Sequence, residues 1–96
     1  MMNKYELVVI VDATLSQEQK ETLMKEVTDS VTKLDGKVIN RQVWLEKQKF
    51  SFRMKGKAEG TYYVVNFESP TSSAAKIREA LRLNEKLLRF LLIKMD

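Results

Sequence analysis

The sequence predicts an α+β fold in which two helices cover one face of a four-stranded antiparallel sheet. The apolar residues follow the order strand, helix, strand, strand, helix, strand. Each helical stretch has a single apolar stripe, so each helix can bury only one side. Two of the strands flank a short Lys/Gly-rich segment, which is typical of an antiparallel hairpin. With 96 residues, 44% of them hydrophobic and 31% charged, the chain is expected to form one globular domain over residues 1–96.

The N-terminal third is expected to form a central strand and a long helix. Residues 5–11 are apolar on both faces, as expected for a strand with neighbours on both sides. Ser16 followed by Gln19 has the spacing of a helix capping box. The helix carries one apolar stripe, made by Leu23, Val27, Val31 and Leu34. Gly36 is expected to stop this helix.

The middle of the chain, WLEKQKFSFRMKGKAEGTYYVVNF at residues 44–67, predicts a long basic hairpin. A strand that begins at Val38 leads into it, and the polar residues of that strand indicate a sheet edge. The period-two alternation of a half-buried strand is carried by Phe50, Phe52 and Met54. Residues 55–60 predict an exposed turn, and residues 62–67 predict the return strand.

The last third is expected to form a second helix and a fourth strand. Ser69 is expected to cap this helix, with Pro70 at its first position. Its apolar stripe consists of Ala74, Ile77 and Leu81. Residues 86–95, KLLRFLLIKM, suit a helix or a strand by propensity. We expect a strand, because a fourth strand is needed to cover the first. The resulting order βαββαβ is that of the split-βαβ, ferredoxin-like architecture.

The composition excludes several kinds of chemistry. The chain has no Cys and no His, so it lacks thiolates, the usual general base and the commonest metal ligand. Its three glycines form no phosphate-binding loop, and its acids have no metal-site spacing. The N-terminal apolar run of five residues is too short for a signal peptide or a membrane span. We therefore expect no enzyme, cofactor, metal, membrane contact or small-molecule substrate.

The charge is unevenly distributed along the chain, whose net charge is +4. Residues 1–36 carry four basic and seven acidic side chains, a balance of −3, whereas residues 37–96 carry thirteen and six, a balance of +7. Residues 41–57 contain six basic side chains and one acid. A basic hairpin with interleaved aromatics suits nucleic acid. A solvated strand face above an ordinary core explains the same residues, and both interpretations stay open.

Several segments in the same order resemble one family. They are NKYE at residues 3–6, GKV at 36–38, the Trp44 region with its basic run, EGTYYV at 59–64, and LRLNEKLLRFLLIK at 81–94. Together they resemble the bacterial family of small-subunit ribosomal protein number six, over essentially the whole chain. The chain departs from the family at Leu45, where Gly is usual, and at residues 50–54, which replace a Leu-Ala-Tyr-Pro-Ile segment. Many members also carry a C-terminal tail, whose contacts we expect to be reduced or missing here.

The resemblance implies a structural component of the small ribosomal subunit, in the cytoplasm. Family members bind the central domain of small-subunit rRNA, on the platform, as a heterodimer with ribosomal protein eighteen. The residues it implies for phosphate neutralisation are Lys4, Arg41, Lys47, Lys49, Arg53, Lys55 and Lys57, with Arg82 and Arg89 as weaker candidates.

Some roles stay open at this point. Trp44 is expected to pack in the core or at an edge rather than to stack on a base, although aromatics at an exposed edge also serve partners. Tyr5, Tyr63 and Phe67 are expected in the core. Base stacking on the sheet face, as in the common RNA-recognition domain, is not supported by GTYYVVNF. The alternative function is a ferredoxin-like module that binds a protein or senses a ligand and has no RNA role.

Overall fold

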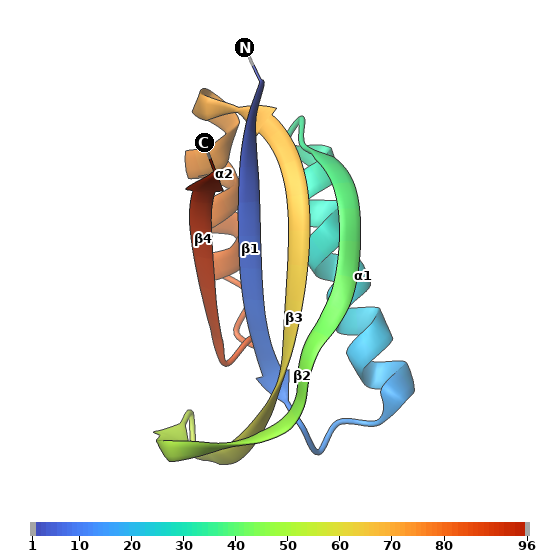
Figure 1. The fold of residues 1–96 in the computed structure, drawn as a ribbon, viewed down its shortest axis with the longest axis vertical. Helices are drawn as coiled ribbons and strands as arrows, with labels where there is room; N and C mark the ends of the chain where they lie inside the picture. Colours follow the sequence, from blue (N-terminus) through green and yellow to red (C-terminus); the bar gives the residue numbers. More distant parts are fainter. Residues whose placement is uncertain (1, 96) are drawn as a thin grey trace.

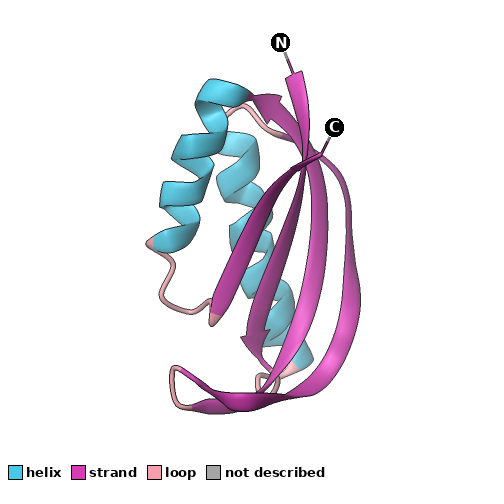
Figure 2. Cartoon of the chain, turned by 60° about the vertical axis from the view of Figure 1, so that its left-hand side comes forward, coloured by secondary structure: helices cyan, strands magenta, loops and turns pink. Residues whose placement is uncertain are grey.

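Two helices pack against one face of a four-stranded antiparallel sheet in the computed structural model, which describes residues 2–95 (Figures 1 and 2). The elements follow the predicted order βαββαβ: β1 (Met2–Asp12), α1 (Gln17–Lys33), β2 (Lys37–Met54), β3 (Lys57–Pro70), α2 (Thr71–Arg82) and β4 (Arg89–Met95). The strand order in the sheet is β2-β3-β1-β4. The predicted ferredoxin-like fold is confirmed, with β1 in the centre and β2 at an edge.

The core lies between the helices and one face of the sheet. In β1, every second side chain points to the helices and is buried, namely Tyr5, Leu7, Val9 and Val11. The matching residues of β3 are Tyr63, Val65 and Phe67, so the expectation for Tyr5, Tyr63 and Phe67 is confirmed. The rings of Tyr5 and Phe67 stack with centroids 5.4 Å apart. Burial of each such side chain stabilises the fold by about 1.5–3 kcal/mol.

The start of α1 is as predicted from the sequence, whereas the backbone at its end differs from the prediction. The hydroxyl of Ser16 accepts a bond of 3.1 Å from the Gln19 amide, and the Gln19 side chain accepts one of 2.9 Å from the Ser16 amide. This is the predicted capping box. After the helix, the residue with positive φ is Asp35, at 67°, rather than Gly36. Gly36 is nevertheless required, because an added Cβ would lie 2.7 Å from the carbonyl oxygen of Val31.

The predicted start of α2 is wrong by one residue. Pro70 is the N-cap rather than the first helical residue, and no side chain caps the helix. Ser69 is buried at the end of β3, where its hydroxyl donates to the Pro70 carbonyl at 3.2 Å. The physical reason is the ladder with β1, which pairs Met2 with Pro70 and Asn3 with Ser69. This pairing keeps both residues extended.

The predicted fourth strand is confirmed, with a later start. The chain turns at residues 85–86, and β4 begins at Arg89 and pairs antiparallel with β1. β4 therefore gives β1 its second neighbour, as expected from the need to cover the first strand. No helix within residues 2–95 is long and apolar enough to cross a membrane.

Candidate nucleic-acid interface

Residues 47–59, which we call the hairpin arm, extend β2 and β3 beyond the rest of the sheet (Figure 1). β1 pairs with β3 only as far as Asp12 opposite Gly60. Past this point β2 and β3 continue alone, bend across the end of the sheet, and turn at Lys55 and Gly56 with φ values of 49° and 79°. The β3 strand begins at Lys57, so the turn is shorter than the predicted 55–60. The arm is thus exposed on several sides.

Three cationic side chains of the hairpin arm have no acidic partner among residues 2–95. They are Lys47, Lys49 and Arg53, all exposed, and no carboxylate oxygen of the described residues lies within 4.0 Å of their charged nitrogens. Arg53 donates only a long bond of 3.5 Å to the Gly56 carbonyl. The arm contains five cations and one acid, Glu59, which lies opposite Lys49 in the β2–β3 register. This end of the molecule is therefore a concentrated positive surface.

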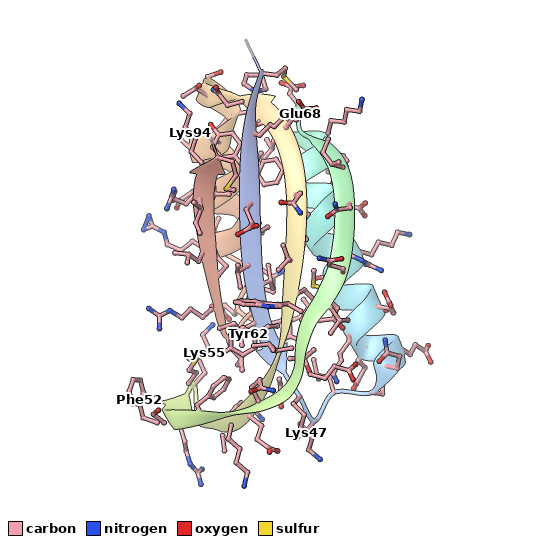
Figure 3. All side chains as sticks on the ribbon, viewed as in Figure 1. Lys47, Phe52, Lys55, Tyr62, Glu68 and Lys94 are labelled. Atoms are coloured by element: carbon pink, nitrogen blue, oxygen red, sulfur yellow. The ribbon has the colours of Figure 1, made fainter. Side chains whose placement is uncertain are left out.

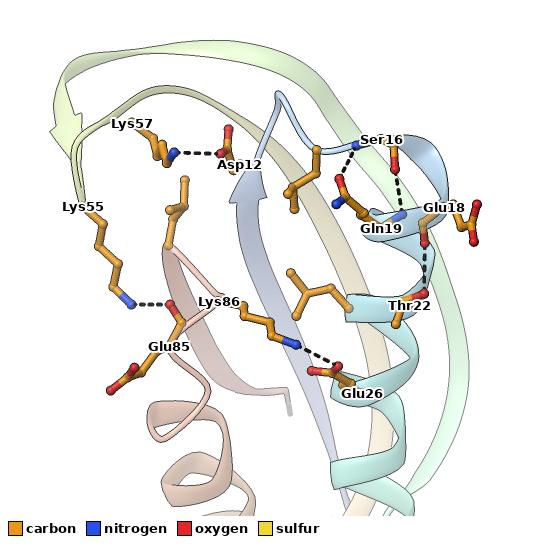
Figure 4. A pocket seen from close by; sticks show the side chains of 13 residues that line it. Asp12, Ser16, Glu18, Gln19, Thr22, Glu26, Lys55, Lys57, Glu85 and Lys86 are labelled. Atoms are coloured by element: carbon orange, nitrogen blue, oxygen red, sulfur yellow. Dashed lines mark hydrogen bonds and ion pairs between the residues drawn. The ribbon is translucent and has the colours of Figure 1, made fainter.

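Two other cations of the arm, Lys55 and Lys57, bind oxygen atoms of the protein itself (Figure 4). The Lys55 ammonium donates to the backbone carbonyls of Glu85, at 3.1 Å, and Leu87, at 2.8 Å. The Lys57 ammonium lies 3.3 Å from a carboxylate oxygen of Asp12. These contacts join the arm to the loop before β4 and to the end of β1. They fix the direction in which the arm points.

Asp12, which forms the ion pair with Lys57, is buried. Its carboxylate also accepts bonds from the Thr14 amide, at 2.9 Å, and the Thr14 hydroxyl, at 2.8 Å. Burial alone would raise the pKa of Asp12, but these bonds and the Lys57 ammonium outweigh it, so the pKa lies below its usual value. Asp12 is therefore ionised at neutral pH and holds both the turn after β1 and the arm.

A cavity of about 880 Å³ lies behind the arm, between the start of α1 and the loop before β4 (Figure 4). Its charged lining has both signs: Lys55, Lys57 and Lys86 face Asp12, Glu18, Glu26 and Glu85. Lys86 forms an ion pair of 3.3 Å with Glu26. Because the four carboxylates outnumber the three ammonium groups, the cavity is a poor site for a polyanion. No group of acidic residues within 2–95 could hold a metal ion.

The remaining predicted RNA-binding residues are scattered. The Arg41 guanidinium forms an ion pair of 2.7 Å with the Glu21 carboxylate of α1, and the Arg82 guanidinium forms one of 3.1 Å with the Glu79 carboxylate in its own helix. Lys4 is at the opposite end of the sheet from the arm, where it pairs with Glu68 of β3 and with Met95 of β4. Arg89 is at the start of β4, opposite Ile10 and on the arm side. The structure thus brings together the arm cations and Arg89, but not all nine residues.

The sheet face opposite the helices forms a second candidate surface, which we call the open face. It is a groove of about 630 Å³ whose apolar lining includes Val8, Ile10, Tyr62, Val64, Leu91 and Ile93. Leu91 is 57% exposed and Ile93 is 38% exposed. These residues were not singled out from the sequence, although the apolar character of both β1 faces was the signal for them.

Trp44 borders the open face near the arm. Its ring meets Tyr62 edge-on with centroids 6.0 Å apart, and it is 56% exposed. The core interpretation of Trp44 is therefore wrong, whereas packing at an edge is confirmed. A half-exposed Trp on an apolar groove is typical of a surface that meets a partner.

Comparison with known proteins connects this architecture to one family. The family model for ribosomal protein S6 matches residues 4–94. Small ribosomal subunit protein bS6 of Campylobacter lari is 32% identical over 95 residues, covering 99% of this chain and 76% of the relative. The bS6 protein of Dictyoglomus turgidum is 33% identical, covering 99% of this chain and 97% of the relative.

A solved structure supports the fold. The crystal structure of 30S ribosomal protein S6 from Thermotoga maritima superimposes with a TM-score of 0.83 at 20% sequence identity, covering 99% of this chain and 89% of that chain. The relatives are named as ribosomal proteins, so the expectation that the chain is not an enzyme is confirmed. The family model and the bS6 relatives together show that this chain belongs to the ribosomal protein S6 family of the small ribosomal subunit.

Proposed function

We propose that this protein binds small-subunit rRNA, in the central domain on the platform, as a heterodimer with ribosomal protein eighteen. The observation that carries the proposal is the hairpin arm, with three exposed cations that have no carboxylate partner among the described residues. As a member of its family, the protein is a component of the small ribosomal subunit and is cytoplasmic.

The arm would act by phosphate neutralisation. Lys47, Lys49 and Arg53 are exposed on a projecting ribbon, where cations outnumber acids and a phosphate backbone can approach. Each contact releases counterions from the RNA, which gives salt-dependent affinity. Lys55 and Lys57 would contribute mainly by holding the arm in place, because their ammonium groups already have partners.

The open face would receive the partner protein. Trp44, Leu91 and Ile93 expose apolar area beside the polar side chains of Gln42 and Arg89, and an apolar centre with a polar rim is the usual anatomy of a protein interface. Trp44 lies on β2 just before the arm, so a protein on the open face would lie close to RNA on the arm. A partner that contacts both would make RNA binding cooperative.

A titration of platform RNA tests the proposal. The protein is added to rRNA central-domain RNA with and without ribosomal protein eighteen, at 50 mM and 200 mM salt, and complexes are separated on native gels. We expect binding that is stronger with the partner and weaker at the higher salt. The absence of RNA binding in every combination would refute the proposal and favour a module without an RNA role.

The role of the open face has its own control. Replacing Leu91 by Ser removes exposed apolar area from the β4 side of the groove, whereas replacing Leu83 by Ser does so at the C-cap of α2, outside the groove. We expect only Leu91→Ser to weaken binding of ribosomal protein eighteen. Equal behaviour of the two variants would remove the open face from the proposal.

A further inference from the structure

Phe52 is the most exposed large hydrophobic side chain of the described residues and lies at the outer end of the hairpin arm (Figure 3). It is 74% exposed. From the alternation of Phe50, Phe52 and Met54, the sequence predicts a half-buried position for all three. Phe50 and Met54 are partly buried, so Phe52 is the exception. An exposed ring here does nothing for the core.

The neighbouring residue of the same pattern shows why Phe52 is free of the sheet. Phe50 lies over Gly60, where its ring occupies the space that a Cβ would need, and its ring is 6.5 Å from that of Tyr62. Phe50 therefore still has the end of the sheet beneath it. Phe52 is two residues farther out, where only β2 and β3 continue.

An irregularity in the β2–β3 ladder lies at Phe52 and turns its ring away from the regular strand direction. Lys49 pairs with Glu59 and Met54 pairs with Lys57, so residues 50–53 of β2 lie opposite the single residue Ala58 of β3. Such bulges bend a strand and redirect its side chains. The ring is thus held on a short, bent ribbon whose turn is fixed by the contacts of Lys55 and Lys57.

The charges around Phe52 identify the kind of molecule that would cover it. Lys49 and Arg53 flank it on the same strand, and the one acid of the arm, Glu59, lies opposite Lys49 rather than opposite Phe52. A planar ring among unpaired cations matches single-stranded RNA, in which phosphates meet the cations and an unstacked base meets the ring. An apolar pocket on a protein would need acids around it to match the same charges.

On the basis of the RNA binding proposed above, we propose that Phe52 stacks on an unpaired base of the bound RNA, while Lys49 and Arg53 bind the adjoining phosphates. The arm would then recognise a site where a base is turned out of its helix. Stacking tolerates any base, so the selectivity is for an unpaired nucleotide rather than for a sequence. This contact adds shape selectivity to phosphate neutralisation.

Three variants test the contact in the protein with platform RNA and ribosomal protein eighteen. Phe52→Leu keeps an apolar side chain without a ring, and Phe52→Trp keeps a ring. We expect Phe52→Leu to weaken RNA binding about tenfold with an unchanged salt slope, and Phe52→Trp to restore it. As the matched control, Leu83→Ser removes a similarly exposed apolar side chain at the C-cap of α2, and we expect RNA binding to be unchanged.

Fluorescence gives a second readout. The chain has a single Trp, Trp44, so the additional indole signal of Phe52→Trp reports on position 52. We expect RNA to quench this additional signal. Wild-type affinity in Phe52→Leu, or a loss confined to binding of ribosomal protein eighteen without RNA, would overturn the stacking proposal while the RNA-binding function stands. If wild-type protein binds no RNA, both proposals fail.

Discussion

Removal of the three unpaired arm charges tests the phosphate contacts quantitatively. In the triple variant Lys47→Gln, Lys49→Gln and Arg53→Gln, three cations without acidic partners in the described structure become neutral. Each phosphate contact contributes about 0.7–0.9 to the slope of log affinity against log salt. We therefore expect the slope to fall by about 2.1–2.7. Over a fourfold rise in salt, the wild type should lose roughly 20- to 40-fold more affinity than the variant.

The fold should tolerate this change. All three side chains are exposed and lie outside the core, and such substitutions usually change the free energy of unfolding by about 0.5 kcal/mol or less each. Urea unfolding checks this point before any RNA measurement. A loss of binding can then be assigned to the missing charges rather than to unfolding.

A second triple variant distinguishes the effect of the arm charges from the effect of the net charge of the protein. Lys25→Gln, Lys33→Gln and Lys76→Gln remove three exposed cations from α1 and α2, on the helical side of the sheet. Both triple variants lower the formal net charge from +4 to +1. The assay is filter binding of platform RNA with ribosomal protein eighteen at several salt concentrations. Equal slopes in the two variants would refute the assignment of phosphate contacts to the arm.

Three further predictions concern the groups that position the arm. The pKa of Asp12 lies below its usual 3.8, so its stabilising contribution is present above that pH and is lost as the pH falls below it. Asp12→Asn should cost about 1–3 kcal/mol in urea unfolding at pH 7 and much less at pH 3; an equal loss at both would contradict this assignment. Gly60→Ala should lower stability by about 1–3 kcal/mol, because the new methyl group meets the Phe50 ring, and an unchanged melting temperature would argue against that packing. Lys55→Met keeps the apolar stem but removes both bonds to the loop before β4, so hydrogen exchange in the arm and this loop should rise; unaltered exchange would show that Lys55 does not hold the arm.

Most of the fold follows from local patterns in the sequence. The apolar stripe of α1 and the Ser16–Gln19 capping box act within a few residues, and both are present in the structure. The Ser69–Pro70 pattern, which predicts a helix start, is equally local. In the structure both residues instead pair with the first residues of β1 and stay extended. A sequence pattern cannot show that two segments almost seventy residues apart extend each other's strands.

The candidate site was predicted less completely, for a similar reason. The basic run of the hairpin is visible in the sequence, but the partners of Lys55, Lys57 and Arg41 come from distant segments. Only the folded chain shows which cations remain without an acid. Likewise, alternation predicts a half-buried Phe52, but the strand continues past the end of the sheet and the ring is 74% exposed.

Cross-linking in assembled ribosomes tests the central claim most directly. Cells that contain this protein are irradiated with ultraviolet light, small subunits are purified, and peptides joined to rRNA are identified by mass spectrometry. We expect the cross-links to fall within residues 47–53 of the hairpin arm, including Phe52. Cross-links confined to α1 and α2, with none in the arm, would contradict RNA binding through this end of the molecule.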